Sequence, residues 1–176
     1  MNQPRSFYLA GTMQGSREGV RVLDQGYRDI LSNAIEEACP GATIHCPHRI
    51  LHERFGARGG ELIRAYQALA DKEWLGPQEL AAGAREVSDA FRELVYLAGW
   101  SDVVVAYLPD QEASMGTAIE MWQAHQNGRV VVTITSMRQN LAVLSTSTMI
   151  VPSIQEFGQS LKDGKVARLL PHLQAA

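Results

Sequence analysis

The chain has 176 residues, 45% of them hydrophobic and 20% charged, and carries a net charge of −3. These values are typical of a single soluble domain, which we expect to span residues 1–176. The lack of a long basic run argues against a nucleic-acid polymer as partner, and no apolar run reaches the length of a membrane span. Two cysteines without CxxC spacing indicate a reduced, cytoplasmic setting.

The expected elements alternate between strands and helices along the chain. Short apolar runs bounded by turn-forming residues predict strands at residues 6–10, 42–46, 102–108, 129–134 and 148–151. Apolar periodicity and composition predict helices at residues 20–38, 61–70, 79–98, 121–128, 139–146 and 154–161, with a polar segment at 47–60. This alternation favours an α/β, single-domain, Rossmann-like three-layer fold, in which a mainly parallel sheet of about five strands has helices on both faces.

Two loops that follow strands hold the candidate chemistry, because ligands bind at the carboxyl ends of the strands in an open parallel sheet. Residues 11–16 follow the first strand, and their glycines can turn amide groups toward an anion. Their spacing is not the GxGxxG of dinucleotide-binding proteins. Asp110, Glu112 and Glu120 follow the third strand, and a carboxylate can act as a nucleophile on the anomeric carbon of a sugar.

The same residues also have plainer interpretations. Asp110 and Glu112 are typical of solvated loop acids. Thr117 as an N-cap, with Glu120 three residues later, matches a capping box that would only begin a helix. Gly116 has no Cβ and would let the backbone come close to a ligand.

Metal and serine-hydrolase chemistry are not indicated by the motifs. Of the five histidines only His48 and His52 are four residues apart, no HExxH motif occurs, and no third ligand is evident. A GxSxG nucleophile elbow is also lacking. We therefore expect neither a metal nor a cofactor.

Three stretches together resemble a known family. They are YLAGTMQGS at residues 8–16, SDVVVA at 101–106 and SMGTAIE at 114–120. They are similar to the opening strand and loop, the central strand and the D/S-x-G-[TVL]-x-x-E element of the nucleoside 2-deoxyribosyltransferase superfamily. Within it, the chain most resembles the 2′-deoxynucleoside 5′-monophosphate N-hydrolase branch.

The resemblance implies a role for each matching residue. Glu120 would be the nucleophile that forms a glycosyl-enzyme, and Tyr8 would orient its carboxylate. Asp89 or Glu93, in the predicted helix 79–98, would protonate the leaving base or contact it. The residues implied in substrate binding are Gly11, Thr12, Met13, Gln14, Ser114 and Gly116.

Position 114 distinguishes the two branches of the family. The transferases usually have an acid there, which binds the free 5′-hydroxyl group, whereas the monophosphate hydrolases have a serine, which binds the 5′-phosphate. Ser114 therefore implies an N-glycosidase that acts on a (deoxy)nucleoside 5′-monophosphate, because an acid would repel the phosphate. One departure is Gln14, where the hydrolases favour an arginine, and Arg17 or Arg49 would have to replace it.

Other functions fit the same residues. One is a deoxyribosyltransferase that exchanges bases on free deoxynucleosides, and another is a non-catalytic nucleotide-binding or sensing domain. GTAIE at residues 116–120 also resembles the GTxxE of phosphoribohydrolases, but the preceding Pro-Gly-Gly is absent. The expected partners are a small-molecule nucleotide or nucleoside and further copies of the chain. The resemblance implies a homodimer or higher homo-oligomer with a shared active site, to which residues 145–148 and Ser153 would contribute.

Overall fold

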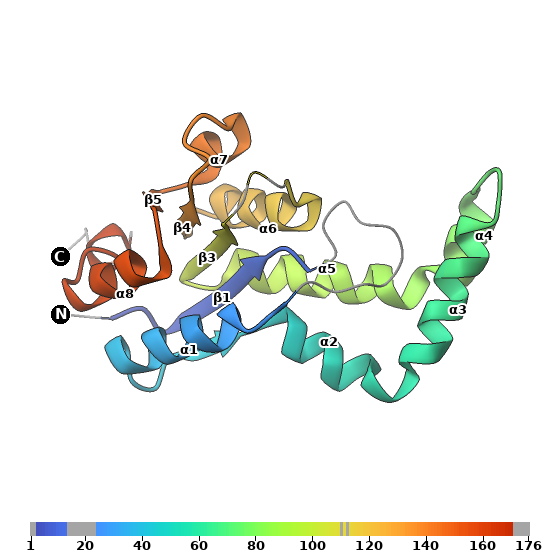
Figure 1. The fold of residues 1–176 in the computed structure, drawn as a ribbon, viewed down its shortest axis with the longest axis horizontal. Helices are drawn as coiled ribbons and strands as arrows, with labels where there is room; N and C mark the ends of the chain where they lie inside the picture. The colour runs from blue at the N-terminus through green and yellow to red at the C-terminus, as the bar shows by residue number, and fades with distance from the viewer. Residues whose placement is uncertain (1–2, 14–23, 110, 112, 171–176) are drawn as a thin grey trace.

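A computed structural model gives the fold and describes residues 3–13, 24–109, 111 and 113–170 (Figure 1). Five parallel strands form one sheet in the order β2-β1-β3-β4-β5, which confirms the predicted α/β fold. The strands are β1 (Ser6–Gly11), β2 (Thr43–His45), β3 (Val103–Leu108), β4 (Val130–Thr135) and β5 (Met149–Val151). The chain order reverses direction between β1 and β3, and a crevice for a ligand forms at such a switch point.

The helices connect the strands as right-handed crossovers of a parallel sheet require. They are α1 (Tyr27–Ala38), α2 (Pro47–Phe55), α3 (Gly59–Ala70), α4 (Pro77–Gly83), α5 (Arg85–Trp100), α6 (Met115–Gln126), α7 (Leu141–Thr146) and α8 (Ile154–Lys162), with short 3₁₀ turns η1 (Gly56–Arg58) and η2 (Ala167–Leu169). No helix in the described ranges is both long and apolar enough to cross a membrane.

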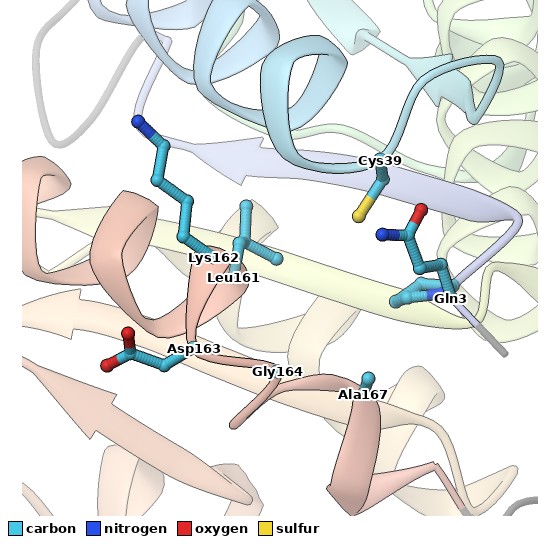
Figure 2. Close-up of a pocket in the computed structure, with 8 residues that line it drawn as sticks. Gln3, Cys39, Leu161, Lys162, Asp163, Gly164 and Ala167 are labelled. Carbon is cyan, nitrogen blue, oxygen red and sulfur yellow. The ribbon is translucent and has the colours of Figure 1, made fainter. Parts of the chain in front are cut away.

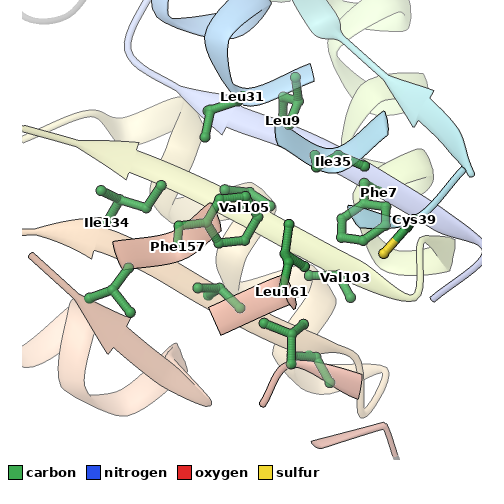
Figure 3. Close-up of a cluster of buried hydrophobic side chains, with 14 of the residues drawn as sticks. Phe7, Leu9, Leu31, Ile35, Cys39, Val103, Val105, Ile134, Phe157 and Leu161 are labelled. Carbon is green, nitrogen blue, oxygen red and sulfur yellow. The ribbon is translucent and has the colours of Figure 1, made fainter. Parts of the chain in front are cut away.

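The sheet is covered on both faces, and each face has its own hydrophobic cluster. Phe7 and Leu9 of β1 pack with α1 and α8 on one face, where Leu31, Ile35, Phe157 and Leu161 surround them (Figure 3). Tyr8 and Ala10, which alternate with them, pack with α5 and α6 on the other face. Burial of both faces explains why the central strands are apolar without interruption.

Some predicted elements differ from the structure. The polar segment at 47–60 contains α2, which begins with Pro47 at a favourable first-turn position and turns Ile50 and Leu51 toward the second cluster. The predicted helix 79–98 is two helices, because α4 ends at Gly83, a residue with low helix propensity. The predicted helix 20–38 begins at Tyr27, and its residues 20–23 lie outside the described ranges.

Helices α3 and α4 lie away from the sheet and extend beyond the end of α5 (Figure 1). Arg58 connects this region to α5 through an ion pair with Glu86, at 3.1 Å between Nη1 and Oε2. The exposed Trp74 lies in the loop between α3 and α4. The candidate site lies at the carboxyl ends of β1 and β3.

Candidate functional site

The centre of the site is a hydrogen bond between two buried side chains. The Tyr8 hydroxyl donates to Oε1 of Glu120 at 2.6 Å, across 112 positions of sequence. Tyr8 points from β1 toward the α5–α6 face, and Glu120 lies in the second turn of α6 and is only 4% exposed. The structure thus brings together Tyr8 and Glu120, and the family resemblance predicted that Tyr8 orients this carboxylate.

The environment of the pair changes the acidity of both groups. Burial raises the pKa of the Glu120 carboxyl to about 7, although the Tyr8 hydrogen bond and the Arg28 charge act in the opposite direction. Burial, together with the neighbouring Glu120 charge, raises the pKa of Tyr8 far above its ordinary value. Tyr8 therefore remains a hydrogen-bond donor at all physiological pH values, whereas Glu120 changes charge near neutrality.

The start of α6 differs from the predicted capping box. Ser114, not Thr117, is the N-cap, and its Oγ accepts a hydrogen bond from the Thr117 amide at 3.3 Å and another from Thr117 Oγ1 at 2.9 Å. Thr117 is buried inside the first turn. The prediction that Thr117 caps the helix is wrong, because the chain enters the helix three residues earlier, where a serine hydroxyl can reach the amide at N3.

Gly116 is the second residue of α6 and is close to α5. A Cβ built on it would lie 3.6 Å from Cε2 of Phe91, which is an ordinary contact. Packing within the protein therefore does not require glycine at this position. The same contact brings the middle of α5 beside the first turn of α6.

Asp89 and Glu93, the two predicted proton donors, lie on α5 on either side of Phe91 in sequence. Asp89 forms an ion pair with Arg92 at 2.7 Å, and its side chain is 46% exposed. Glu93 forms an ion pair with Arg54 of α2, and its side chain is 62% exposed. Neither hydrogen-bonds to Tyr8 or Glu120 within the described part of the chain.

The end of β1 holds the residues predicted to line the nucleotide. Gly11 closes the strand, and a Cβ there would collide with the hydroxyl of Tyr27, whose ring stacks on Tyr107 with centroids 4.4 Å apart. Glycine at this position thus has a packing reason of its own. Thr12 and Met13 follow and are half-buried. Gln14, like the loop acids Asp110 and Glu112, lies outside the described residues.

Arg28 is a buried residue of this region that the sequence prediction missed. It lies in the first turn of α1 and is 2% exposed. Its guanidinium donates to the Leu9 carbonyl at 2.5 Å, the Gly11 carbonyl at 3.1 Å and Gln25 Oε1 at 2.6 Å. The spacing could have revealed it, because Arg28 lies three and seven residues before Leu31 and Ile35 on the buried face of α1.

A cavity of about 540 Å³ lies between the start of α1 and α2. Arg28 and Cys46 line it, and both act electrostatically on Tyr8. Glu120 does not line this cavity itself, so Arg28 connects the cavity to the Tyr8–Glu120 pair. The other lining residues are Asp24, Gln25, Gly26, Asp29, His48, Arg49 and His52.

A second, smaller hollow of about 160 Å³ lies at the opposite end of the sheet (Figure 2). Gln3, which precedes β1, and Cys39, which follows α1, lie on one side of it, and Leu161 and Lys162 of α8 lie on the other. None of the predicted site residues lines it, and parallel sheets bind ligands at the other edge. Among the described residues no three histidine, cysteine or acidic side chains gather as metal ligands.

The hydroxyl groups predicted to act across a subunit boundary form hydrogen bonds within the chain. Ser145 and Thr146 donate to carbonyls one turn earlier in α7, at 2.7 Å and 2.8 Å. Thr148 accepts from the Val131 amide, and Ser153 caps α8 by accepting from the Glu156 amide. These bonds give the hydroxyl-rich segment a structural use, and its contribution to a neighbouring subunit stays a prediction.

No protein-family model matches the sequence, and no curated protein matches it. The 2-deoxyribosyltransferase of Bacillus psychrosaccharolyticus superimposes with a TM-score of 0.54, at 13% identity, over 94% of this chain and 96% of that one. A conserved protein from Enterococcus faecalis V583 gives 0.53, at 17% identity, over 91% and 98%. A CMP N-glycosidase from Clostridium botulinum gives only 0.41, at 12% identity, over 89% and 96%, which is too low to establish a common fold. The chain therefore shares its fold with a 2-deoxyribosyltransferase.

Proposed function

We propose that the protein is an N-glycosidase that cleaves the bond between base and sugar in a (deoxy)nucleoside 5′-monophosphate, with Glu120 as nucleophile. The observation that carries this proposal is the 2.6 Å hydrogen bond from Tyr8 to Glu120. A glutamate that only capped the helix would bond to the amides of its own first turn, whereas this one bonds to a phenol on β1. The fold shared with a 2-deoxyribosyltransferase supports glycosyl transfer as the reaction class.

In the proposed reaction the Glu120 carboxylate is the nucleophile. Tyr8 holds Oε1 of Glu120, and Oε2 attacks the anomeric carbon while the bond from that carbon to the base breaks. The bonding electron pair leaves with the base, which takes a proton from an acid. Water then attacks the anomeric carbon, the bond from that carbon to Oε2 breaks, and the proton lost by water goes to the acid that protonated the base. This step releases the sugar phosphate and restores both carboxyl groups. The buried carboxylate also stabilises the positive charge that develops on the sugar ring.

The proton donor is an acid of α5 in this proposal. Asp89 and Glu93 are both on the helix whose Phe91 contacts the first turn of α6. Asp89 is the less exposed of the two, and its partner Arg92 comes from its own helix, whereas Glu93 pairs with Arg54 of α2. These observations favour Asp89, which can turn toward a ligand without breaking a contact between helices.

Ser114 supports a phosphate rather than a free hydroxyl group as the substrate's 5′ substituent. Its Oγ acts as acceptor in both of its described hydrogen bonds, so the hydroxyl proton remains to donate to a phosphate oxygen. The amides of a helix's first turn also attract an anion. Residue 114 would thus cap the helix and bind the substrate at the same time.

Substitution of Ser114 by aspartate tests this assignment. Aspartate is an equally good N-cap, so α6 remains intact, but its charge repels a phosphate. We expect free base to be released from monophosphates by the wild type, and Ser114→Asp to lower that rate roughly 10²-fold relative to use of free nucleosides. Chromatography of the bases released from the common monophosphates and nucleosides measures both activities.

Asparagine at the same position is the matched control, because Ser114→Asn caps the helix without adding charge. An equal loss in both variants would contradict a phosphate contact. Base exchange between nucleosides without net hydrolysis would instead identify the alternative, a 2-deoxyribosyltransferase, whose fold this chain shares.

We also propose that a second copy of the chain packs on α6. Met115, Ile119 and Trp122 form an exposed apolar stripe along this helix, and no Asp, Glu, Lys or Arg occupies its exposed positions. Tyr96 and Trp100 of the neighbouring α5 are also exposed, with ring centroids 5.7 Å apart. Because the stripe begins next to Ser114, a copy seated there would border the substrate.

Light scattering during gel filtration tests the interface. We expect the wild type to be a dimer and Ile119→Lys to be a monomer, because two lysines would be buried in a symmetric interface. Gln155→Lys, at an exposed position of α8 on the opposite face of the sheet, is the control and should leave the dimer intact. A monomeric wild type, or a dimeric Ile119→Lys, would contradict the proposal.

A further inference from the structure

The carboxyl end of β1 has a neighbouring strand on one side only. β2 ends at His45, which lies opposite Tyr8, so β1 continues past it to Gly11. The carbonyls of odd-numbered residues face β2, as the hydrogen bond from the Thr43 amide to the Arg5 carbonyl shows. The carbonyls of Leu9 and Gly11 therefore face the space beyond the end of β2, where buried acceptors need another donor.

Arg28 supplies that donor to both carbonyls. Its two Nη atoms reach Leu9 and Gly11, and its Nε atom reaches Gln25, so all three nitrogens of the planar guanidinium have partners. A lysine has only one nitrogen and cannot span two carbonyls in this fixed geometry. Arg28 thus donates the hydrogen bonds that a longer β2 would have donated, and it fixes the strand that carries Tyr8.

The guanidinium also places a positive charge in the buried region around Tyr8 and Glu120, where burial disfavours the charged form of both groups. Its charge lowers the pKa of the Glu120 carboxyl and of the Tyr8 hydroxyl, opposing the effect of burial on both. Burial lowers the pKa of His48 across the cavity, and the Arg28 charge acts in the same direction. The titratable or charged groups around this charge are Tyr8 of β1, Asp24, Tyr27 and Asp29 at α1, Cys46, His48, Arg49 and His52 at α2, Tyr107 of β3 and Glu120 of α6.

We infer that Arg28 is a positioning residue of this site: its buried guanidinium fixes the end of β1 through the Leu9 and Gly11 carbonyls, so that it holds the strand of Tyr8 in place and puts a buried positive charge at that end. Its consequence for catalysis rests on the proposed function, because only the ionised carboxylate can attack a sugar. The inference predicts separate effects of removing the charge and of removing the hydrogen-bonding geometry.

Two substitutions separate these effects. Arg28→Met removes the charge and keeps much of the side-chain volume, whereas Arg28→Lys keeps the charge and loses the two-carbonyl geometry. In the pH profile of kcat we expect the rising limb of Arg28→Met to shift to higher pH by about one unit, the scale on which a nearby cation acts on a carboxylate. The midpoint of Arg28→Lys should stay near that of the wild type, although its kcat falls.

A titration without substrate keeps this inference separate from the proposed function. The ¹³C signal of the Glu120 carboxyl, assigned by its loss in Glu120→Gln, reports the same midpoint even if no substrate is turned over. If Arg28→Met does not fold, Arg28→Gln, which is neutral and still donates to a carbonyl, replaces it. An unchanged midpoint in the neutral variant, or an equal shift in Arg28→Lys, would overturn the inference.

Discussion

Glu120→Gln is expected to reduce base release by roughly 10⁴- to 10⁶-fold, the range over which loss of a catalytic triad residue acts in well-studied enzymes. Glutamine has nearly the same shape, and its amide oxygen can still accept the hydrogen bond from Tyr8. Only the capacity to form a bond to the sugar is lost. Steady-state release of free base from the best monophosphate, measured by chromatography, gives the ratio.

Glu156→Gln is the control for this experiment, since Glu156 is exposed in the first turn of α8 on the other face of the sheet. Mass spectrometry of the wild type after rapid quenching should also find the mass of the sugar phosphate on the peptide that contains Glu120. If neither the wild type nor Glu120→Gln releases base, while calorimetry detects the same nucleotide affinity in both, the chain is a non-catalytic nucleotide-binding domain.

The second large effect concerns stability as a function of pH. The Glu120 carboxyl has a pKa of about 7 in the folded protein against an ordinary 4.5, so the folded state keeps a proton that the unfolded chain releases. Stability from this group is therefore complete below pH 4.5 and is lost as pH rises through 7. The difference corresponds to about 3 kcal/mol of unfolding free energy.

Glu120→Gln removes this dependence. We expect urea unfolding to give similar stabilities for the two proteins near pH 4.5, and Glu120→Gln to be the more stable by about 3 kcal/mol near pH 8. Other titrating groups affect both proteins equally, so the difference between the two curves isolates Glu120. Parallel curves across this range would show that the pKa of this carboxyl is the same in the folded and unfolded protein. A buried carboxyl group kept at such a cost to stability is typical of a functional residue.

The strands could be predicted because a strand that is buried on both faces of a parallel sheet has an uninterrupted apolar sequence. Val103, Val104 and Val105 point alternately to the two clusters, so no polar residue interrupts the run. The helices were harder. The polar residues of α2 hide Ile50 and Leu51, and the sequence around Gly83 continues the apolar periodicity although the helix does not.

In the candidate site, too, some residues could be predicted from the sequence and others could not. Glu120 and Tyr8 could be paired because a motif resemblance connects them, whereas local pattern alone favoured a cap at Thr117. The helical spacing indicates that Arg28 is buried, but its hydrogen-bond partners could not be predicted, because they depend on where β2 ends relative to β1. That relation is a property of strand register, and a single helix sequence does not encode it.

The hydrogen bond between Tyr8 and Glu120 also has a consequence for the folding pathway. It closes a loop of 112 positions, and chain entropy opposes such closure until many other contacts have formed. β1 must first pair with β3, and α6 must then pack on the face of the sheet to which Tyr8 points. The Tyr8–Glu120 hydrogen bond should therefore form in refolding only with the last cooperative step, later than most of the helical signal.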